Sequence, residues 1–265
     1  MSDFESAVDA VISGDVAALR SMLQRDPELV RRRSEREHRA TLLHYIAANG
    51  VEQERQGTPP NAVEVAVSLL QAGAEVDAPA EMYGAPCTTL TLLVSSTPPA
   101  EAGLQAALAE TLLDHGAAFQ SAVLTALAFG FLETAQVLAA RGAPLNLAAF
   151  AGLGRVDDVA RLLPASDPES RHVALVLAAV HGPVAVVRLL LDAGEDPNRF
   201  NPDGYHAHST PLHQAVWSNQ LAVVRELVER GARVDIRDTV HRGTPLDWAI
   251  YGGREKIAEY LSRGS

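Results

Sequence analysis

The chain has 265 residues, enough for one large domain or a repeat array. Hydrophobic residues make up 47% of it and aromatic residues only 5%, so its apolar side chains are mainly Ala, Leu and Val, which suit closely packed helices. With 22 basic and 33 acidic residues its formal charge is −11, and this acidic balance argues against nucleic acid as a partner.

The first residues of the chain and its cysteine content indicate the cellular compartment in which the protein is expected. The first residues lack the basic segment and apolar stretch of a secretory signal. No run approaches the ~18 apolar residues that span a bilayer. Cys87 is the only cysteine, so no disulfide can form within the chain, and a reducing compartment is expected. We therefore expect a cytoplasmic protein with no membrane as partner.

The first 120 residues are predicted to form helix pairs. Residues 1–33 read as an N-terminal capping unit, with apolar residues at helical spacing on both sides of Gly14 and a polar outer face. Residues 34–120 are predicted to form two more pairs. Each of these carries a proline-containing insert between its helices, at residues 51–62 and 95–105.

The rest of the chain is predicted to hold pairs of unequal length. Residues 121–171 are expected to form two short pairs, because the breaks at Gly130 and Gly154 lie too close together to leave room for an extended connection, or finger. Residues 172–243 are predicted to form two pairs with fingers, and residues 244–265 a C-terminal capping unit.

A repeat emerges when the chain is laid over itself. The segment Thr210–His213 (TPLH) recurs 34 residues later as Thr244–Asp247 (TPLD). Thr before Pro marks a helix start, because the hydroxyl caps free N–H groups and Pro fits the first helical position. A second amphipathic helix follows each segment, and Gly231 is placed to end the first of these in a left-handed conformation.

These motifs resemble the ankyrin-repeat family, whose pattern is T-P-L-H, an A-A pair, a Gly break, V-x-x-L-L and G-A-x-x-N/D. Further repeat ends of this form lie at residues 69–77, 112–120, 138–146 and 190–198. The resemblance implies an all-α, ankyrin-like solenoid of about eight stacked helix-turn-helix units, some with short β-hairpin fingers. It also implies a protein–protein interaction module that binds its partner on a concave face made of fingers and first helices, and in which His213 ties neighbouring units together.

The candidate binding residues follow from this register. Both tryptophans and five of the nine histidines lie in the last third of the chain. Aromatic anchors rimmed by polar residues are typical of protein interfaces, and the acidic chain predicts a basic partner surface. The residues predicted to bind a partner or ligand are His181, Tyr205, His206, His208, Trp217, Ser218, His241 and Tyr251. Trp248 is expected in the core.

Two alternatives stay open beside protein binding. A His206-x-His208 pair on an extended strand would place both rings on one face, as zinc requires, with His241 or Asp247 to complete the site. No cysteine pairing or HExxH spacing supports a metal, and no cofactor is predicted. A small-molecule site or enzyme could use His206, His208 and Asp247 for proton transfer. The chain has no phosphate-binding glycine loop or G-x-S-x-G elbow, and Cys87 is expected to be a small buried residue. A closed pocket of several hundred Å³ on the concave face of the last three units, in place of an open groove, would favour the ligand alternative.

Overall fold

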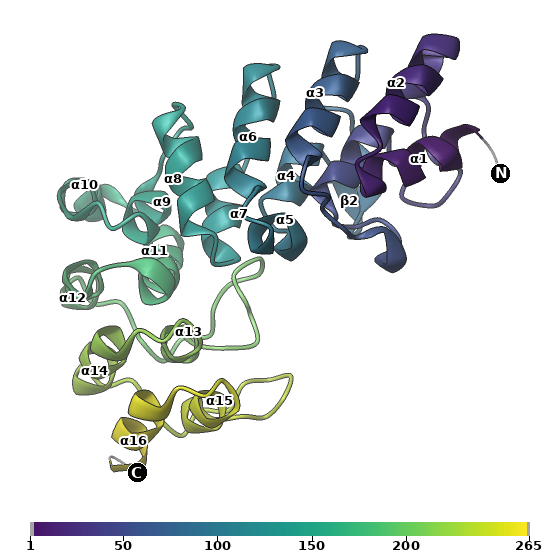
Figure 1. Ribbon diagram of the computed structural model, residues 1–265. Coiled ribbons are helices and arrows are strands. Elements are labelled where there is room, and N and C mark those ends of the chain that lie inside the picture. The colour runs from purple at the N-terminus through teal and green to yellow at the C-terminus, as the bar shows by residue number, and fades with distance from the viewer. Residues whose placement is uncertain (1–2, 264–265) are drawn as a thin grey trace. The chain divides into compact units, whose positions relative to one another are not determined.

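The computed structural model describes residues 3–263, and Figure 1 shows them as a succession of short helices. The chain divides into two compact units. Unit 1 comprises Met1–Ala126 and Glu133–Ala143, and unit 2 comprises Leu127–Leu132 and Pro144–Ser265. Within the described residues, no helix is long and apolar enough to cross a bilayer.

Unit 1 holds the first four helix pairs, and the α7–α8 connection belongs to unit 2. In chain order its elements are α1 (Asp3–Ser13), α2 (Val16–Arg25), η1 (Pro27–Arg31), η2 (Leu42–Ala47), η3 (Gln53–Arg55), α3 (Ala62–Gln71), β1 (Ala80–Met82), β2 (Ala85–Cys87), α4 (Thr89–Leu93), α5 (Thr97–Glu101), α6 (Gln105–Asp114), α7 (Ala122–Ala128) and α8 (Leu132–Ala140). The insert predicted at residues 95–105 contains the short helix α5, and the one at residues 51–62 contains the 3₁₀ turn η3.

Unit 2 holds four further pairs. Its elements are α9 (Leu147–Gly152), α10 (Val156–Leu162), η4 (Leu163–Ala165), α11 (Pro168–His181), α12 (Val184–Asp192), α13 (Pro211–Trp217), α14 (Leu221–Glu229), α15 (Pro245–Tyr251) and α16 (Glu255–Arg263). Over residues 3–263 this makes eight pairs, so the all-α, ankyrin-like array expected from the sequence is confirmed.

Small residues let the first helices of unit 2 pack closely. A Cβ added at Gly182, at the end of α11, would lie 2.9 Å from the Cα of Ala178 and 3.1 Å from the carbonyl oxygen of Ala151 on α9. A Cβ at Gly152 would meet the Leu127 side chain at 2.9 Å. At Gly182 the neighbouring atoms are backbone, so a larger residue would clash there, whereas at Gly152 the Leu127 side chain would have to move.

The Thr-Pro segments start helices as predicted. Pro211 and Pro245 occupy the first helical positions of α13 and α15, and each preceding threonine forms a reciprocal capping box with the residue three positions on. Gly231 follows α14 with a left-handed φ of 95°, as the sequence predicts.

Short β-hairpin fingers were expected in some units, and the described residues contain one. In the described residues only β1 and β2 are strands. They pair antiparallel, with Ala80 opposite Cys87, across a tight turn in which Tyr83 and Gly84 both have positive φ. The fingers of residues 199–209 and 236–243 are irregular loops. Each is closed by one backbone hydrogen bond, from Asn201 to Ser209 (2.8 Å) and from Asp238 to Gly243 (2.9 Å).

Candidate functional site

A pocket of about 530 Å³ is formed in unit 2 by its last two fingers and the first helices that follow them. Its walls come from the 199–209 finger, α13, the 236–243 finger and α15. The residues that line it are His206, His208, Gln214, Trp217, His241, Gly243, Asp247, Trp248 and Tyr251. We call it the aromatic pocket.

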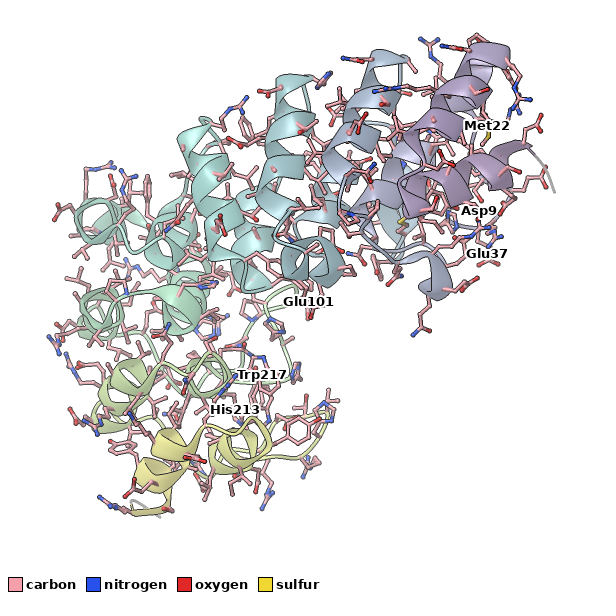
Figure 2. All side chains as sticks on the ribbon, viewed as in Figure 1. Asp9, Met22, Glu37, Glu101, His213 and Trp217 are labelled. Atoms are coloured by element: carbon pink, nitrogen blue, oxygen red, sulfur yellow. The ribbon has the colours of Figure 1, made fainter. Side chains whose placement is uncertain are left out.

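Three aromatic rings from α13 and α15 meet in the aromatic pocket. Trp217, labelled on α13 in Figure 2, approaches Trp248 edge to face, with ring centroids 6.0 Å apart. Trp217 also stacks with Tyr251 at 6.5 Å, with the ring planes 17° apart. Trp217 remains 47% exposed and Tyr251 84% exposed. These two rings therefore present large apolar faces to solvent that an occupant of the pocket would cover.

A buried carboxylate holds the third ring in place. Asp238 is fully buried and accepts hydrogen bonds from the backbone N–H groups of Val240 (3.0 Å), His241 (2.6 Å) and Gly243 (2.8 Å), and from the indole N–H of Trp248 (3.0 Å). Burial by itself would raise the pKa of Asp238, but these four donors hold it well below its ordinary value. Asp238 therefore stays anionic, closes the 236–243 finger and fixes the indole in the wall of the pocket.

The His206-x-His208 pair does not lie on a strand, which corrects the expectation from the sequence. His206 has a left-handed φ of 62°, and its Nε2 donates to the carbonyl oxygen of Ala128 at 2.8 Å. The rings of His206 and His208 are 6.2 Å apart and nearly perpendicular. Among residues 3–263, no group of three histidine, cysteine, aspartate or glutamate side chains is placed to hold a metal ion. The zinc hypothesis therefore has no third ligand in the described chain.

His208 packs against the wall that Asp238 fixes. Its ring lies 5.8 Å from that of Trp248, and burial lowers its pKa, with the neighbouring imidazoles of His206 and His241 acting in the same direction and the charge of Asp238 opposing them. A neutral imidazole in this place adds a ring face and a hydrogen-bond acceptor to the pocket.

His213 is a structural residue, as the resemblance implied. The backbone N–H and hydroxyl of Thr210 lie 3.3 and 2.9 Å from its Nδ1, so Nδ1 accepts and Nε2 carries the proton. Nε2 donates to the carbonyl oxygen of Gly243 in the next finger at 3.3 Å. Burial lowers the pKa of His213, which keeps the ring neutral. This side chain, labelled in Figure 2, joins one helix pair to the finger of the next.

The C-terminal part of the chain matches a family model for ankyrin repeats over residues 145–238 and 208–265. Human cyclin-dependent kinase inhibitor 2A is 34% identical over 119 residues, which cover 43% of this chain and 74% of that protein. Bovine cyclin-dependent kinase 4 inhibitor B is 31% identical over 129 residues, 47% of this chain and 95% of that protein. The chain belongs to the ankyrin-repeat family.

Other members of the family are much longer than the matched segment. Mouse ankyrin repeat and SAM domain-containing protein 6 is 35% identical over 109 residues, and these span 40% of this ankyrin-repeat chain but 12% of the mouse protein. The matched segment is therefore a small part of that protein's length.

Asp247 takes the place in its repeat that His213 holds in the repeat before. Its Oδ2 accepts from the backbone N–H and the hydroxyl of Thr244, both at 2.8 Å, and these bonds lower its pKa. A carboxylate with one oxygen committed to a helix cap and a lowered pKa is a poor general base. Since His206 also has its Nε2 proton engaged, neither the geometry nor the relatives support the enzyme alternative built on His206, His208 and Asp247.

Five of the eight residues predicted to bind line the aromatic pocket: His206, His208, Trp217, His241 and Tyr251. The other three do not. His181 is half-buried and its Nε2 donates to the carbonyl oxygen of Leu127 at 2.8 Å, while burial lowers its pKa. Tyr205 is half-buried in the 199–209 finger, and Ser218 ends α13. All eight remain predictions as binding residues.

Sequence reasoning missed three pocket residues: Gln214, Gly243 and Trp248. Trp248 was expected in the core, but it is half-buried and its ring forms a wall of the pocket. Trp248 follows TPLD as Gln214 follows TPLH, so these two missed residues occupy the same position of successive repeats. A Cβ at Gly243 would lie 3.1 Å from Trp248 and 3.2 Å from Asp238, which explains the glycine.

Cys87 lies outside this site, at the end of β2 in unit 1. It is a free thiol and only half-buried, in contrast to the buried residue expected from the sequence. Partial burial and the charge of Glu81 raise its pKa, so the thiol form dominates at neutral pH. This disfavours a role as nucleophile.

Proposed function

We propose that this ankyrin-repeat chain is a protein-interaction module that binds its partner across the aromatic pocket. The observation that carries the proposal is the exposed, stacked pair of Trp217 and Tyr251 on successive first helices, on the rim of a preformed pocket. Exposed aromatic rings beside a pocket are typical anchors of protein interfaces. Two relatives carry names that describe them as inhibitors of protein kinases, that is, as proteins that act on other proteins.

The charge of the chain suggests the character of the partner. A formal charge of −11 would attract a basic protein surface and speed association at low salt. We propose a partner surface that carries Lys or Arg, and an affinity that falls as salt is raised. We place the encounter in the cytoplasm, where the single cysteine would stay reduced.

The test compares partner capture by four forms of the full chain from a lysate of the native host. Trp217→Ala with Tyr251→Ala should lower capture of a saturable partner at least tenfold, because hot-spot aromatics typically contribute more than ~1.4 kcal/mol each. Tyr83→Ala, which removes an aromatic residue 74% exposed in unit 1, and Ile250→Ala, which removes an exposed residue of α15 outside the pocket, are the controls. Equal capture by all four forms would refute the proposal.

A second candidate function, the binding of a small molecule, is favoured by the volume of the pocket. About 530 Å³ falls within the range of ~300–1,000 Å³ typical of small-ligand sites. A purified protein that carries a small molecule through gel filtration, released on denaturation and found by mass spectrometry, would support this function. The Trp217 and Tyr251 double variant should then be empty.

A further inference from the structure

The aromatic pocket differs from an ordinary apolar cleft because its walls combine aromatic ring faces with polar groups. Trp217, Trp248 and Tyr251 supply ring faces, and Gln214 and the imidazoles supply polar edges. The faces of such rings carry negative potential, and they attract a cation placed over them within about 6 Å, most strongly where the ring is Trp. Two of the three rings are tryptophans, so the pocket has the chemistry to hold a cation.

Two carboxylates add to this potential. Asp238 accepts the indole N–H of Trp248 at 3.0 Å, and a fixed anion at that edge increases the electron density of the indole face. Asp247 lines the pocket directly. Its Oδ2 caps α15, while its Oδ1 accepts no hydrogen bond from any residue between 3 and 263, so one oxygen is open to a donor.

The cations of the protein itself reduce this potential only weakly. Arg237 Nη1 lies 3.8 Å from Asp247 Oδ2, but both side chains are more than half exposed, so this ion pair is weak. Arg254 donates to the carbonyl oxygen of Trp217 at 2.9 and 3.2 Å, and its Cζ stands 6.0 Å from the centre of the Trp217 ring. One guanidinium therefore already lies near a ring that lines the pocket.

The form of the cation follows from the acceptors available. A lysine ammonium is strongly hydrated and needs three acceptors when it loses its water. The pocket offers few open carboxylate oxygens, because Asp238 is saturated by four donors and Asp247 has one oxygen committed. A guanidinium is more weakly hydrated, stacks flat on aromatic rings, and can use Asp247 Oδ1 for a charge-assisted hydrogen bond.

We propose that the aromatic pocket receives an arginine side chain of the partner protein, with the guanidinium over the Trp217 and Trp248 rings and one N–H directed to Asp247. This inference rests on the proposed function and names the group that the partner would insert. The volume of about 530 Å³ leaves room for the side chain and the adjoining backbone.

The experiment uses the natural fluorescence of the protein. The chain has two tryptophans and both line the pocket, so every change in tryptophan emission on titration arises there. The probe is a blocked pentapeptide, Ala-Ala-Arg-Ala-Ala, added to the full chain. Its matched control carries citrulline in place of arginine, which keeps the shape and removes the charge. Peptides with lysine and with trimethyllysine complete the set.

The arginine peptide should give a saturable change in emission, with an affinity about tenfold above that of the citrulline peptide. Asp247→Asn, which keeps a side chain suited to a helix cap, should reduce this preference severalfold. Trp217→Leu should abolish it, while circular dichroism confirms that the helices remain. Asp235→Asn, which removes an exposed charge outside the pocket, should leave it unchanged.

Three results would overturn the arginine assignment: equal affinity for the arginine and citrulline peptides, no saturable response to the arginine peptide, or tighter binding of the lysine or trimethyllysine peptide. These are distinguishable from failure of the proposed function. If partner capture depends on Trp217 and Tyr251 while the peptides bind alike, only the arginine inference fails. If the double variant captures the partner as well as the wild type does, the interaction surface lies elsewhere, whether or not the peptides bind.

Discussion

Asp238 connects folding and function at the scale of single residues. One buried carboxylate closes a finger through three backbone N–H groups and orients Trp248 through a fourth bond. A buried anion is costly unless its oxygens are satisfied, and here every bond that stabilises the anion also shapes the pocket. The pocket wall and the stability of the last repeat therefore depend on the same side chain.

Replacing Asp238 by Asn should lower the free energy of unfolding by about 1–3 kcal/mol, because one amide oxygen cannot accept from four donors and its NH₂ group faces others. Urea unfolding followed by tryptophan fluorescence would measure the loss. Asp235→Asn, in which the side chain is 67% exposed, serves as the control and should change the value by less than about 0.5 kcal/mol. Equal losses in the two variants would contradict the role given to Asp238.

Acid should weaken the wild type more than this variant. The pKa of Asp238 is lowered in the folded chain, so the stability that it contributes is present above its unfolded value of about 3.9 and is lost as pH falls toward the folded pKa. Other carboxylates with lowered pKa also act in this range, so the informative quantity is the difference between wild type and Asp238→Asn. That difference should shrink below about pH 4. A constant difference would argue that Asp238 is already protonated in the fold.

At the scale of helices and loops, the sequence predicts those features that depend on only a few neighbouring residues, such as helix starts and ends. The Thr-Pro starts and the left-handed Gly231 follow from capping rules that involve only a few neighbouring residues. The fingers could not be predicted in the same way. The conformation of the 236–243 finger depends on Trp248, ten residues after Asp238, and His206 bonds to Ala128, 78 residues before it. The order of residue types along the chain does not indicate which distant residues come into contact, so the finger conformations could not be predicted.

The close contact of α9 with α11 gives a test at this scale. Gly182→Ala should destabilise unit 2 by about 1–3 kcal/mol, because the new Cβ would lie 3.1 Å from the carbonyl oxygen of Ala151 on α9 and 2.9 Å from the Cα of Ala178 in α11 itself, and backbone cannot move aside cheaply. Gly57→Ala, where a Cβ has no atom within 4 Å, should be neutral or slightly stabilising. Thermal unfolding of the two variants measures both effects. Equal stability of the Gly182→Ala variant and the wild type would contradict the close packing described at this position.

At the scale of the whole chain, each helix pair is stabilised mainly by its neighbours. Stability in such an array is close to a sum of repeat and interface contributions, so a break in the middle should uncouple the parts on either side. The short pair α9–α10 is the place to make one. Ala160 is an exposed residue inside α10, so Ala160→Pro breaks the helix without leaving a cavity.

Unfolding of Ala160→Pro should separate into two transitions. Tryptophan fluorescence reports only on α13 and α15, whereas far-ultraviolet circular dichroism reports on all helices. We expect the two unfolding curves to coincide in the wild type and to separate in the variant. The midpoint of the fluorescence curve should shift less from its wild-type value than the midpoint of the dichroism transition that reports the destabilised helices around α10. A single coincident transition in the variant would mean that the chain behaves as one cooperative block.

The bond that joins the two fingers of unit 2 has a consequence for how an occupant would be held. The backbone N–H of Thr239 donates to the carbonyl oxygen of His208 at 2.8 Å. The pocket is built half from the 199–209 finger and α13 and half from the 236–243 finger and α15, and this bond joins the two fingers. When residues 244–263 fray, the pocket ceases to exist, and an occupant that needs both halves must suppress that local opening. Amide hydrogens of α15 and α16 should then exchange more slowly with solvent when the pocket is filled. Amide exchange in the last repeat would therefore report whether the pocket is occupied.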